Sequence, residues 1–472
     1  MQAQVDPLLQ RLTDYCLRPP IQKKKAIQTA HYCLMDSLGC ALLALNKPDC
    51  QRLIQPVFEQ PPGDFFCRIP GTAMLADPLQ ASFSLGVMIR WLDYNDTWLA
   101  AEWGHPSDNI GMILALADHL DQKYPHKPIT MGELFSVMIK AYEIQGVLAL
   151  KNSFNQVGLD HVILVKLAST AAACILLGSD ETVFINALSQ VWLDGHSLRS
   201  YRHYPNTGSR KSWAAGDASR RGLWLALISH AGEMGYPLVL NTPKWGFCDV
   251  LFNSQRLQLA RPMGSYIMEN ILFKLPFPAE FHAQTALDAA IQLYPKIKSK
   301  WQAISQIVIT TTEAGQRIIS KSGPLKNPAD RDHCLEYIVA VGLLYGTLSY
   351  ESYELPLAND PEIDRLRSLM TVREDPSFTQ DYLDPSKRAI PNSVTLHFND
   401  GSKSITETVH FPLGHPQRRD ESISTIESKF EQNLKTVLPA TQIKAITALF
   451  KDPQALSQCR VSDFMATWKK EE

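Results

Sequence analysis

The sequence predicts a mainly α-helical protein in which a large helical domain is interrupted by a smaller α+β domain. Stretches rich in Ala and Leu repeat apolar residues every three or four positions, which is the period of an amphipathic helix. Strand-like patterns are confined to a β-branched run at 304–311 and an alternating segment at 391–410. A chain of 472 residues is also too long for one core.

The predicted helices follow one another closely through the first half of the chain. In the stretch 160–177, Asp160 fits a helix N-cap and Gly178 fits a C-terminal stop. With so few strand signals, we expect an all-α domain to about residue 270. The predicted helices cover 25–44, 79–89, 107–120, 131–150, 160–177, 180–193 and 221–231.

The pattern changes near Lys274. A helix at 281–293 precedes the strand at 304–311, and 391–410 reads as a hairpin in which Gly401 supplies the positive φ of an Asn-Asp-Gly turn. Helical periodicity returns at 423–437 and 440–450 and should pack back on the first domain. We therefore expect a discontinuous helical domain of residues 1–273 and 411–472, and an α+β lid domain with an antiparallel sheet at 274–410.

Composition narrows the classes of function. The 46 basic and 48 acidic residues nearly cancel, so binding of nucleic acid or membrane surfaces through bulk charge is not expected. Nine scattered cysteines without a Cys-x-x-Cys pair indicate reduced thiols in a cytoplasmic protein and disfavour a zinc ribbon or a local iron–sulfur cluster. No apolar run approaches the ~20 residues of a membrane span. We expect no metal and no cofactor.

The stretch 90–109 concentrates groups that can do chemistry. It mixes ionisable side chains with three tryptophans, which suits a partly buried cleft with shifted pKa values. His105 precedes a predicted helix start, where free N–H groups favour an anion. We interpret the stretch as the active-site loop of an enzyme acting on a carboxylate. Its candidate groups are Asp93, Asp96, Thr97, Glu102, His105 and Asp108.

This stretch resembles the MmgE/PrpD family, in its PrpD branch. Four further stretches are similar to that branch and occur in the same order: NSFNQVGLDHVILVKLAST (152–170), YRHYPNTGSRKSWAAGDASR (201–220), GSYIMENILFKLPFPAEFHAQTA (264–286) and GPLKNPADRDHC (323–334). The resemblance implies a large helical domain plus a small lid with the site between them. It also implies metal-independent loss of water from a tricarboxylate, 2-methylcitrate, to give 2-methyl-cis-aconitate in propionate breakdown.

The resemblance also implies that Asp93, Thr97 and His105 line the pocket. The structural alternative is that Asp93 caps a helix and His105 is an ordinary loop histidine. Seven residues separate Thr97 from His105, more than in the decarboxylase branch of the family. The piece Glu102-Trp-Gly favours the PrpD branch instead. The tryptophans themselves are expected to be packing anchors.

The resemblance implies three more pocket residues. His161 follows Asp160 at a helix start, where the dipole disfavours the imidazolium. Lys211 lies in a Gly/Ser-containing loop whose N–H groups could share an anion, and Lys274 lies at the domain junction. The lysines would stabilise charge, His105 and His161 would move protons, and Thr97 would bind substrate. Arg331 and His333 are weaker candidates for lid-side contacts.

Alternative functions stay open on the residues alone. Sibling activities on the same scaffold are citrate or aconitate dehydration, cis-aconitate decarboxylation and iminodisuccinate epimerisation. A divalent-metal hydrolase could use Asp93, Asp96, Glu102 and His105 as ligands, although their spacing is not helical. A non-enzymatic binding module would leave costly buried charges without a use. Amphipathic helices can bury their apolar faces within one chain or between two chains, so assembly as a homodimer also stays open.

Overall fold

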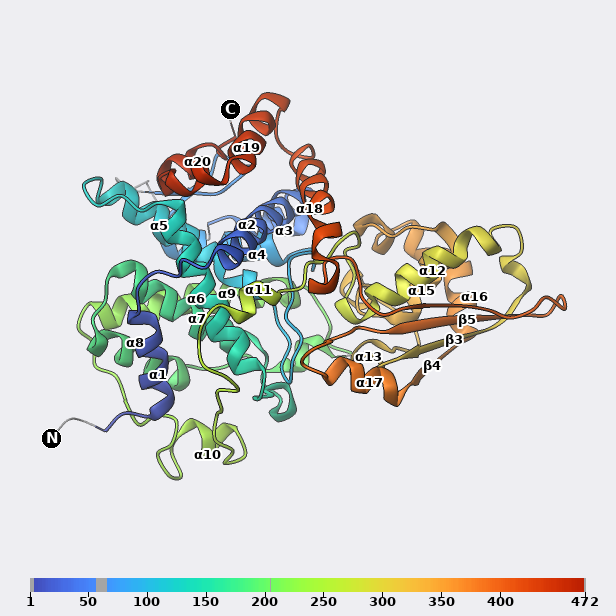
Figure 1. Ribbon diagram of the computed structural model, residues 1–472, viewed down its shortest axis with the longest axis horizontal. Coiled ribbons are helices and arrows are strands. Elements are labelled where there is room, and N and C mark those ends of the chain that lie inside the picture. Colours follow the sequence, from blue (N-terminus) through green and yellow to red (C-terminus); the bar gives the residue numbers. More distant parts are fainter. Residues whose placement is uncertain (1–3, 57–65, 204, 471–472) are drawn as a thin grey trace.

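The computed structural model describes residues 4–56, 66–203 and 205–470 and contains two bodies that lie side by side (Figure 1). Tyr204, inside one of the family-like stretches, falls outside the described residues. One hydrophobic core draws on residues from 8 to 275 and from 426 to 468, and a second draws on residues from 279 to 396. The mainly α fold class is confirmed. The domain limits at 274 and 410 stay a proposal, which this division of the core supports.

The helical body contains most of the predicted helices, with shifts of a few residues at their ends, except that the helix predicted for 221–231 begins eleven residues earlier, at Arg210. The expectation of an all-α body is wrong, because two antiparallel strands of two residues each, β1 (Cys67–Arg68) and β2 (Leu75–Ala76), pair within it. Its helices are α1 (Pro7–Leu17), α2 (Lys24–Ala44), α3 (Pro48–Ile54), α4 (Pro78–Arg90), α5 (Ile110–Lys123), α6 (Met131–Ala149), α7 (Val162–Leu177), α8 (Glu181–Leu193), α9 (Arg210–His230), α10 (Phe247–Leu251), α11 (Tyr266–Asn270), α18 (Arg419–Leu434), α19 (Ala440–Lys451), α20 (Pro453–Gln458) and α21 (Val461–Ala466).

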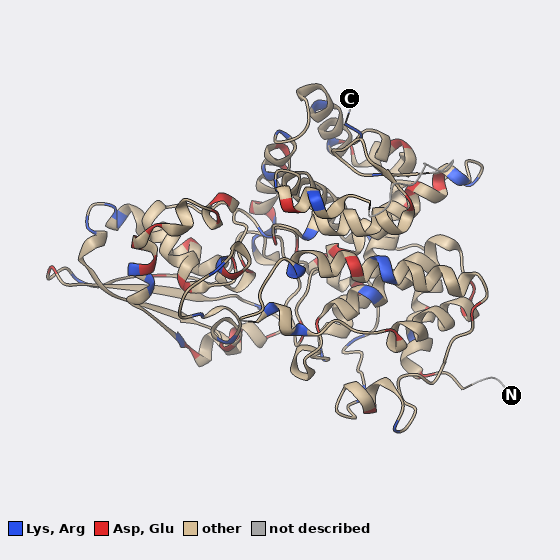
Figure 2. Ribbon diagram, turned by 180° about the vertical axis from the view of Figure 1, so that it is seen from behind, with Lys and Arg blue, Asp and Glu red and all other residues tan. Residues whose placement is uncertain are grey.

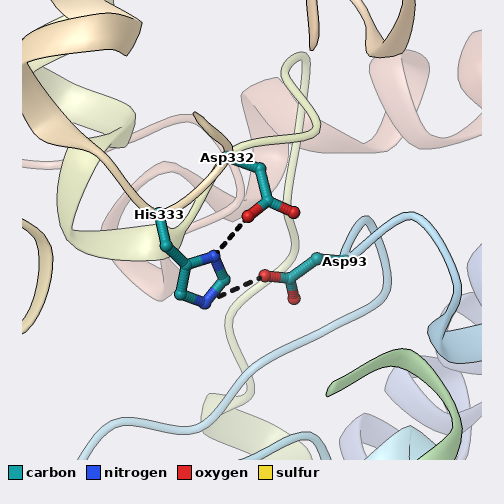
Figure 3. Close-up of side chains that lie close together, drawn as sticks. All are labelled: Asp93, Asp332 and His333. Carbon is teal, nitrogen blue, oxygen red and sulfur yellow. Dashed lines mark hydrogen bonds and ion pairs between the residues drawn. The ribbon is translucent and has the colours of Figure 1, made fainter. Parts of the chain in front are cut away.

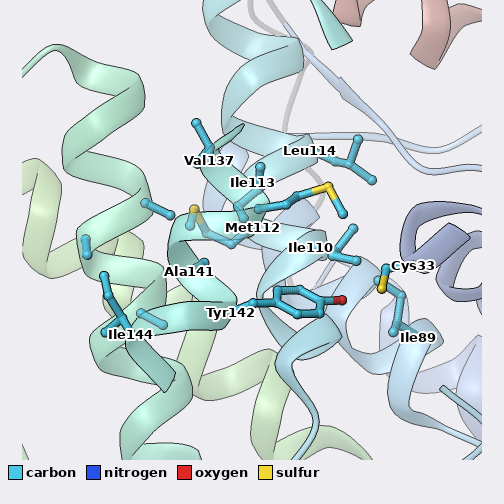
Figure 4. Close-up of a cluster of buried hydrophobic side chains, with 14 of the residues drawn as sticks. Cys33, Ile89, Ile110, Met112, Ile113, Leu114, Val137, Ala141, Tyr142 and Ile144 are labelled. Carbon is cyan, nitrogen blue, oxygen red and sulfur yellow. The ribbon is translucent and has the colours of Figure 1, made fainter. Parts of the chain in front are cut away.

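Close helix packing in this body places the active-site loop. Apolar side chains of α2, α4, α5 and α6 interlock around the buried ring of Tyr142 (Figure 4). Helices α4 and α9 approach so closely that a Cβ on Gly86 would lie 2.6 Å from the Cα of Gly216. A side chain at either glycine would push the two helices apart. This crossing fixes the end of α4, where the loop begins, beside the start of α9.

The second body is built around a four-stranded sheet of order β4-β3-β5-β6. Strand β3 (Ile304–Thr311) and the hairpin of β5 (Asn392–Phe398) and β6 (Ile405–Val409) match the predicted strands, and Gly401 has φ +80°. The sheet is mixed rather than antiparallel, because β4 (Met370–Glu374) runs parallel to β3. The helices are α12 (Gln284–Ile297), α13 (Glu313–Ile319), α14 (Pro328–Arg331), α15 (Leu335–Tyr345), α16 (Pro361–Ser368) and α17 (Pro376–Leu383).

Charges are distributed over both bodies rather than gathered on one. Figure 2 shows basic and acidic residues interspersed along the helices and the sheet. This agrees with the net charge of −2. Among the described residues, no helix is both long and apolar enough to cross a membrane.

Lys429 of α18 connects the C-terminal tail to the elements that form the site. Its buried Nζ donates to Oδ1 of Asp36 at 2.7 Å, to the carbonyl of Tyr94 at 2.7 Å and to the carbonyl of Lys274 at 3.0 Å. Burial alone would lower the pKa of Lys429, but the Asp36 carboxylate raises it above its usual range. One ammonium therefore ties α2, the active-site loop and the junction between the bodies together.

Replacing Lys429 with Met should destabilise the whole protein. The change leaves the Asp36 carboxylate buried without its cation, a loss of about 3–5 kcal/mol in the free energy of unfolding. Chemical denaturation followed by circular dichroism measures it. Lys435→Met, at an exposed position at the end of the same helix, is the matched control and should change stability by less than about 0.5 kcal/mol. Equal stability of the two variants would contradict this role.

Candidate active site

A cavity of about 620 Å³ is lined by residues of both bodies. The helical body contributes the active-site loop and residues near 155–161 and 199–203, and the second body contributes the segment 317–333. Five of the six predicted site residues line it: Asp93, Thr97, His105, His161 and Lys274. The ionisable lining groups are Arg90, Asp93, His105, His161, Arg199, Arg202, His203, Lys274, Glu280, Arg317, Lys321, Asp330 and His333.

Asp93 lines the cavity and forms ion pairs with two cations. It is buried, and its φ of +51° is a conformation that non-glycine residues seldom adopt. The guanidinium of Arg90 donates to its Oδ1, and Lys274 Nζ donates to Oδ1 at 2.6 Å and to its carbonyl at 2.8 Å. Burial alone would raise the pKa of Asp93, but Arg90 and Lys274 hold it well below its usual range. Asp93 is therefore a permanent carboxylate.

His105 is held as a neutral imidazole with one nitrogen free. Its Nδ1 lies 2.6 Å from the carbonyl oxygen of Asp96, which can only accept, so Nδ1 carries the proton. Its Nε2 lies 3.6 Å from Oδ1 of Asp93. Burial, then Arg90 and Lys274, keep the pKa of His105 well below its usual range. A neutral imidazole with an unprotonated Nε2 at the cavity is equipped to act as a base.

Thr97 and the tryptophans shape the loop around His105. The hydroxyl of Thr97 donates to the carbonyl of Gly104 at 3.1 Å, which leaves its oxygen able to accept from a ligand. Trp98 is buried as a packing anchor. Trp103 differs from that expectation, because its ring lines the cavity and the guanidinium of Arg199 lies 4.9 Å from the ring centroid.

His161 lies near His105, with 6.0 Å between the ring centroids. Both of its ring nitrogens are buried, and neither forms a hydrogen bond with a described residue. Burial lowers its pKa to about 3, against the opposing effect of Asp160. The predicted neutrality therefore has a different main cause, which is burial rather than the helix end. The N-cap of α7 is His161 rather than the predicted Asp160. The Asp160 carboxylate still accepts from the N–H of Val162 at 3.3 Å and also binds Arg202.

Lys211 lies deeper than predicted and on a different element. It occupies the first turn of α9 rather than a loop, because that helix begins at Arg210. Its buried Nζ donates to both carboxylate oxygens of Asp332 at 2.7 Å and lies 3.1 Å from Nδ1 of His333. Burial lowers the pKa of Lys211, while Asp332 and Asp93 act in the opposite direction. The expected loop position of Lys211 is therefore wrong, whereas its part in binding a substrate anion stays a prediction.

Several site groups were not predicted from the sequence. Arg90 precedes Asp93 by three positions, and Asp332 lies inside the family-like stretch 323–334 beside His333, the weaker candidate named above. The spacing of three residues between Arg90 and Asp93 could have indicated their ion pair. Asp332 and Lys211 are 121 positions apart, so only the folded chain brings them together. Arg331 donates to the carbonyl of Tyr353 and is absent from the cavity lining, whereas its neighbour His333 lines it.

Within the described residues, the ligand set of the alternative metal hydrolase (Asp93, Asp96, Glu102 and His105) does not come together as one group. The carboxylate of Asp96 accepts from Ser107 and Tyr142, and that of Glu102 accepts from Asn155. In the described part of the chain, the group with ligand atoms close enough for one ion is Asp93, Asp332 and His333 (Figure 3). Three cations, Arg90, Lys211 and Lys274, already bind these carboxylates. Like-charge repulsion therefore disfavours a metal ion there.

Comparison with known proteins identifies matching families and relatives. A model of the MmgE/PrpD N-terminal domain matches residues 10–260, and one of the MmgE/PrpD C-terminal domain matches residues 277–452. The chain is 50% identical to a 2-methylcitrate dehydratase of Escherichia coli K12, over 96% of this chain and 95% of that protein. It is 51% identical to one of Cupriavidus necator (98% and 96%) and 46% identical to a mitochondrial one of Yarrowia lipolytica (94% and 86%).

Glu280, at the edge of the cavity, should make stability depend on pH. Burial alone would raise its pKa, but His282, whose Nδ1 is 3.0 Å from Oε1, contributes to lowering it from 4.5 to about 2. A lowered folded-state pKa gives stability that is present above pH 4.5 and lost as pH falls toward 2. Glu280→Gln should therefore cost about 3 kcal/mol at pH 7, and the difference from wild type should shrink below pH 4.5.

Urea unfolding at several pH values measures this difference. Glu354→Gln is the control, because Glu354 is 43% exposed in its pair with Lys47. It should change the free energy of unfolding by less than about 1 kcal/mol. A Glu280→Gln penalty that stays constant from pH 7 to pH 3 would contradict the assigned ionisation.

Proposed function

This chain belongs to the MmgE/PrpD family, and from that premise we propose that it is a hydro-lyase that removes water from 2-methylcitrate to give 2-methyl-cis-aconitate. Its 2-methylcitrate dehydratase relatives align over nearly the full length of the chain. The observation that most supports the proposal is the cavity itself, where a neutral His105 stands among a surplus of cations.

The charge balance of the cavity fits a tricarboxylate. Its lining has six basic side chains and three acidic ones: Arg90, Arg199, Arg202, Lys274, Arg317 and Lys321 against Asp93, Glu280 and Asp330. A substrate with three carboxylates would offset that surplus. Charge-assisted hydrogen bonds to fixed cations are strong and directional. The site therefore favours a small polyanion over a neutral or cationic ligand.

The chemistry follows from the position of each group. Nε2 of His105 takes the proton from the methyl-bearing carbon, next to a carboxylate, and Asp93 stabilises the imidazolium that results. Negative charge grows on that carboxylate as the proton leaves, and Lys274 is placed to stabilise it. Lys211 contributes a second positive charge, shared with Asp332. Thr97 accepts a hydrogen bond from the substrate hydroxyl. The role of His161 as a second proton carrier stays a prediction.

The setting of the enzyme is part of the same proposal. All nine cysteines are free, and eight of them are buried, which supports a reducing, cytoplasmic location. The sibling activities are disfavoured by the names of the relatives, which specify 2-methylcitrate dehydratase. Assembly as a homodimer stays a prediction.

Protein treated with EDTA should dehydrate 2-methylcitrate. Ultraviolet absorbance follows the new double bond conjugated to a carboxylate, and citrate in a parallel reaction tests the preference for the methylated substrate. We expect a strong signal with 2-methylcitrate and a weak one with citrate. If neither substrate gave an absorbance change until divalent metal was added, that result would contradict the lysine and histidine chemistry. If there were no absorbance change with or without metal, the substrates of the sibling activities would be tested next.

Lys274→Met should lower kcat for 2-methylcitrate by about 10²–10³-fold, because it removes a cation placed at the developing charge. The larger effect should fall on kcat rather than KM, since the charge is greatest in the transition state. Steady-state kinetics measure the split, and circular dichroism checks folding. Lys435→Met is the control. A change confined to KM would assign Lys274 to ground-state binding alone.

A further inference from the structure

Elimination of water needs a second proton carrier besides His105, because the departing hydroxyl must gain a proton. His161 is poorly placed to supply it. Both of its ring nitrogens are buried without a hydrogen bond to a described residue. Its ring packs against Gly104, where a Cβ would lie 3.0 Å from Cδ2. Although His161 lines the cavity, neither nitrogen is accessible, so its ring would have to move before it could exchange a proton with a ligand there.

His333 has the exposure and the contacts that His161 lacks. It follows α14 in the second body, lines the cavity, and keeps 19% of its side chain exposed. Its Nδ1 lies 2.6 Å from Oδ1 of Asp332, and its Nε2 lies 3.6 Å from Oδ2 of Asp93 (Figure 3). His105 approaches the other oxygen of Asp93, also at 3.6 Å. Two imidazoles, one from each body, therefore flank one carboxylate.

We propose that His333 is the general acid that protonates the departing hydroxyl, and that Asp332 positions its ring. The inference rests on the proposed dehydration and deepens it by assigning the second proton transfer. Lys211 holds Asp332 through both carboxylate oxygens, so its buried ammonium acts on the reaction through this positioning residue as well as by its charge.

The surroundings of the two rings distinguish acid from base. Nε2 of His333 faces Asp93, and Nδ1 faces both Asp332 and, at 3.1 Å, the ammonium of Lys211. The two carboxylates favour a ring protonated on both nitrogens. Burial and then Lys211 outweigh these carboxylates, so the pKa of His333 lies below its usual range in the unliganded site. The carboxylates of a bound substrate would add negative charge beside the ring and favour its protonated form. His105 instead donates from Nδ1 to a neutral carbonyl and lies near Arg90 and Lys274, which favours the neutral form. His105 is therefore the base and His333 the acid.

The step balances in atoms and electrons. His105 Nε2 takes the proton from the methyl-bearing carbon, and the electron pair of that C–H bond becomes the second bond to the hydroxyl-bearing carbon. The C–O bond breaks with its electron pair on oxygen, and Nε2 of His333 gives that oxygen a proton, so water leaves. His105 ends protonated and His333 neutral, and exchange with solvent restores both. The reaction needs no oxidant, reductant or co-reactant.

A substrate whose leaving group needs no proton separates the two roles. The analogue of 2-methylcitrate with fluorine in place of the tertiary hydroxyl expels fluoride directly. His333→Gln should lose about 10²–10⁴-fold in kcat for 2-methylcitrate while it releases fluoride at a rate within about tenfold of wild type. His105→Gln should lose both reactions. His397→Gln, on β5 with its ring bonded to Ser404, is the matched control and should lose neither.

Circular dichroism checks each variant, and His333→Asn replaces His333→Gln if the latter does not fold. Activity of the His333 variant on 2-methylcitrate within about threefold of wild type would overturn the inference, as would equal losses on both substrates. Either outcome leaves the proposed function intact if wild type dehydrates 2-methylcitrate. A wild-type enzyme that is silent on 2-methylcitrate would overturn the proposed function, and the role of His333 with it.

Discussion

The buried carboxylate of Asp93 is the interaction on which the rest of the site depends. A buried anion is costly unless it is paired and hydrogen-bonded. Arg90 and Lys274 supply that pairing from the end of α4 and from the junction between the bodies. Once Asp93 is fixed as an anion, the two histidines beside it gain defined orientations, and the strained φ of Asp93 is held by its surroundings.

The same network joins the two bodies at the cavity. Lys211 from α9 meets Asp332 from the second body, and His333 reaches Asp93 across the same boundary. Because these groups come from separate cores, the site is complete only while the cores keep this arrangement. Lys429 adds to it from the C-terminal tail by binding the carbonyls of Tyr94 and Lys274. Stability and catalysis thus share several buried ammonium groups.

The sequence predicted what depends on local pattern and missed what depends on distant contacts. Strand β3 and helix α2 have strong periodicity and were located to within one residue. Helix α9 was predicted eleven residues too short, because its first half is rich in charged residues. The edge strand β4 is short and largely exposed, so it lacked an apolar signal. The partnership of Asp332 with Lys211 joins positions 121 apart, which no local spacing reveals.

The most direct test of this account is a crystal structure of the His105→Gln variant with 2-methylcitrate bound, since loss of the base should slow turnover enough to trap the substrate. We expect a substrate carboxylate bonded to Lys274, the methyl-bearing carbon beside residue 105, and the tertiary hydroxyl facing Nε2 of His333. A substrate bound outside this cavity, or with its carboxylates away from Lys274, would contradict it.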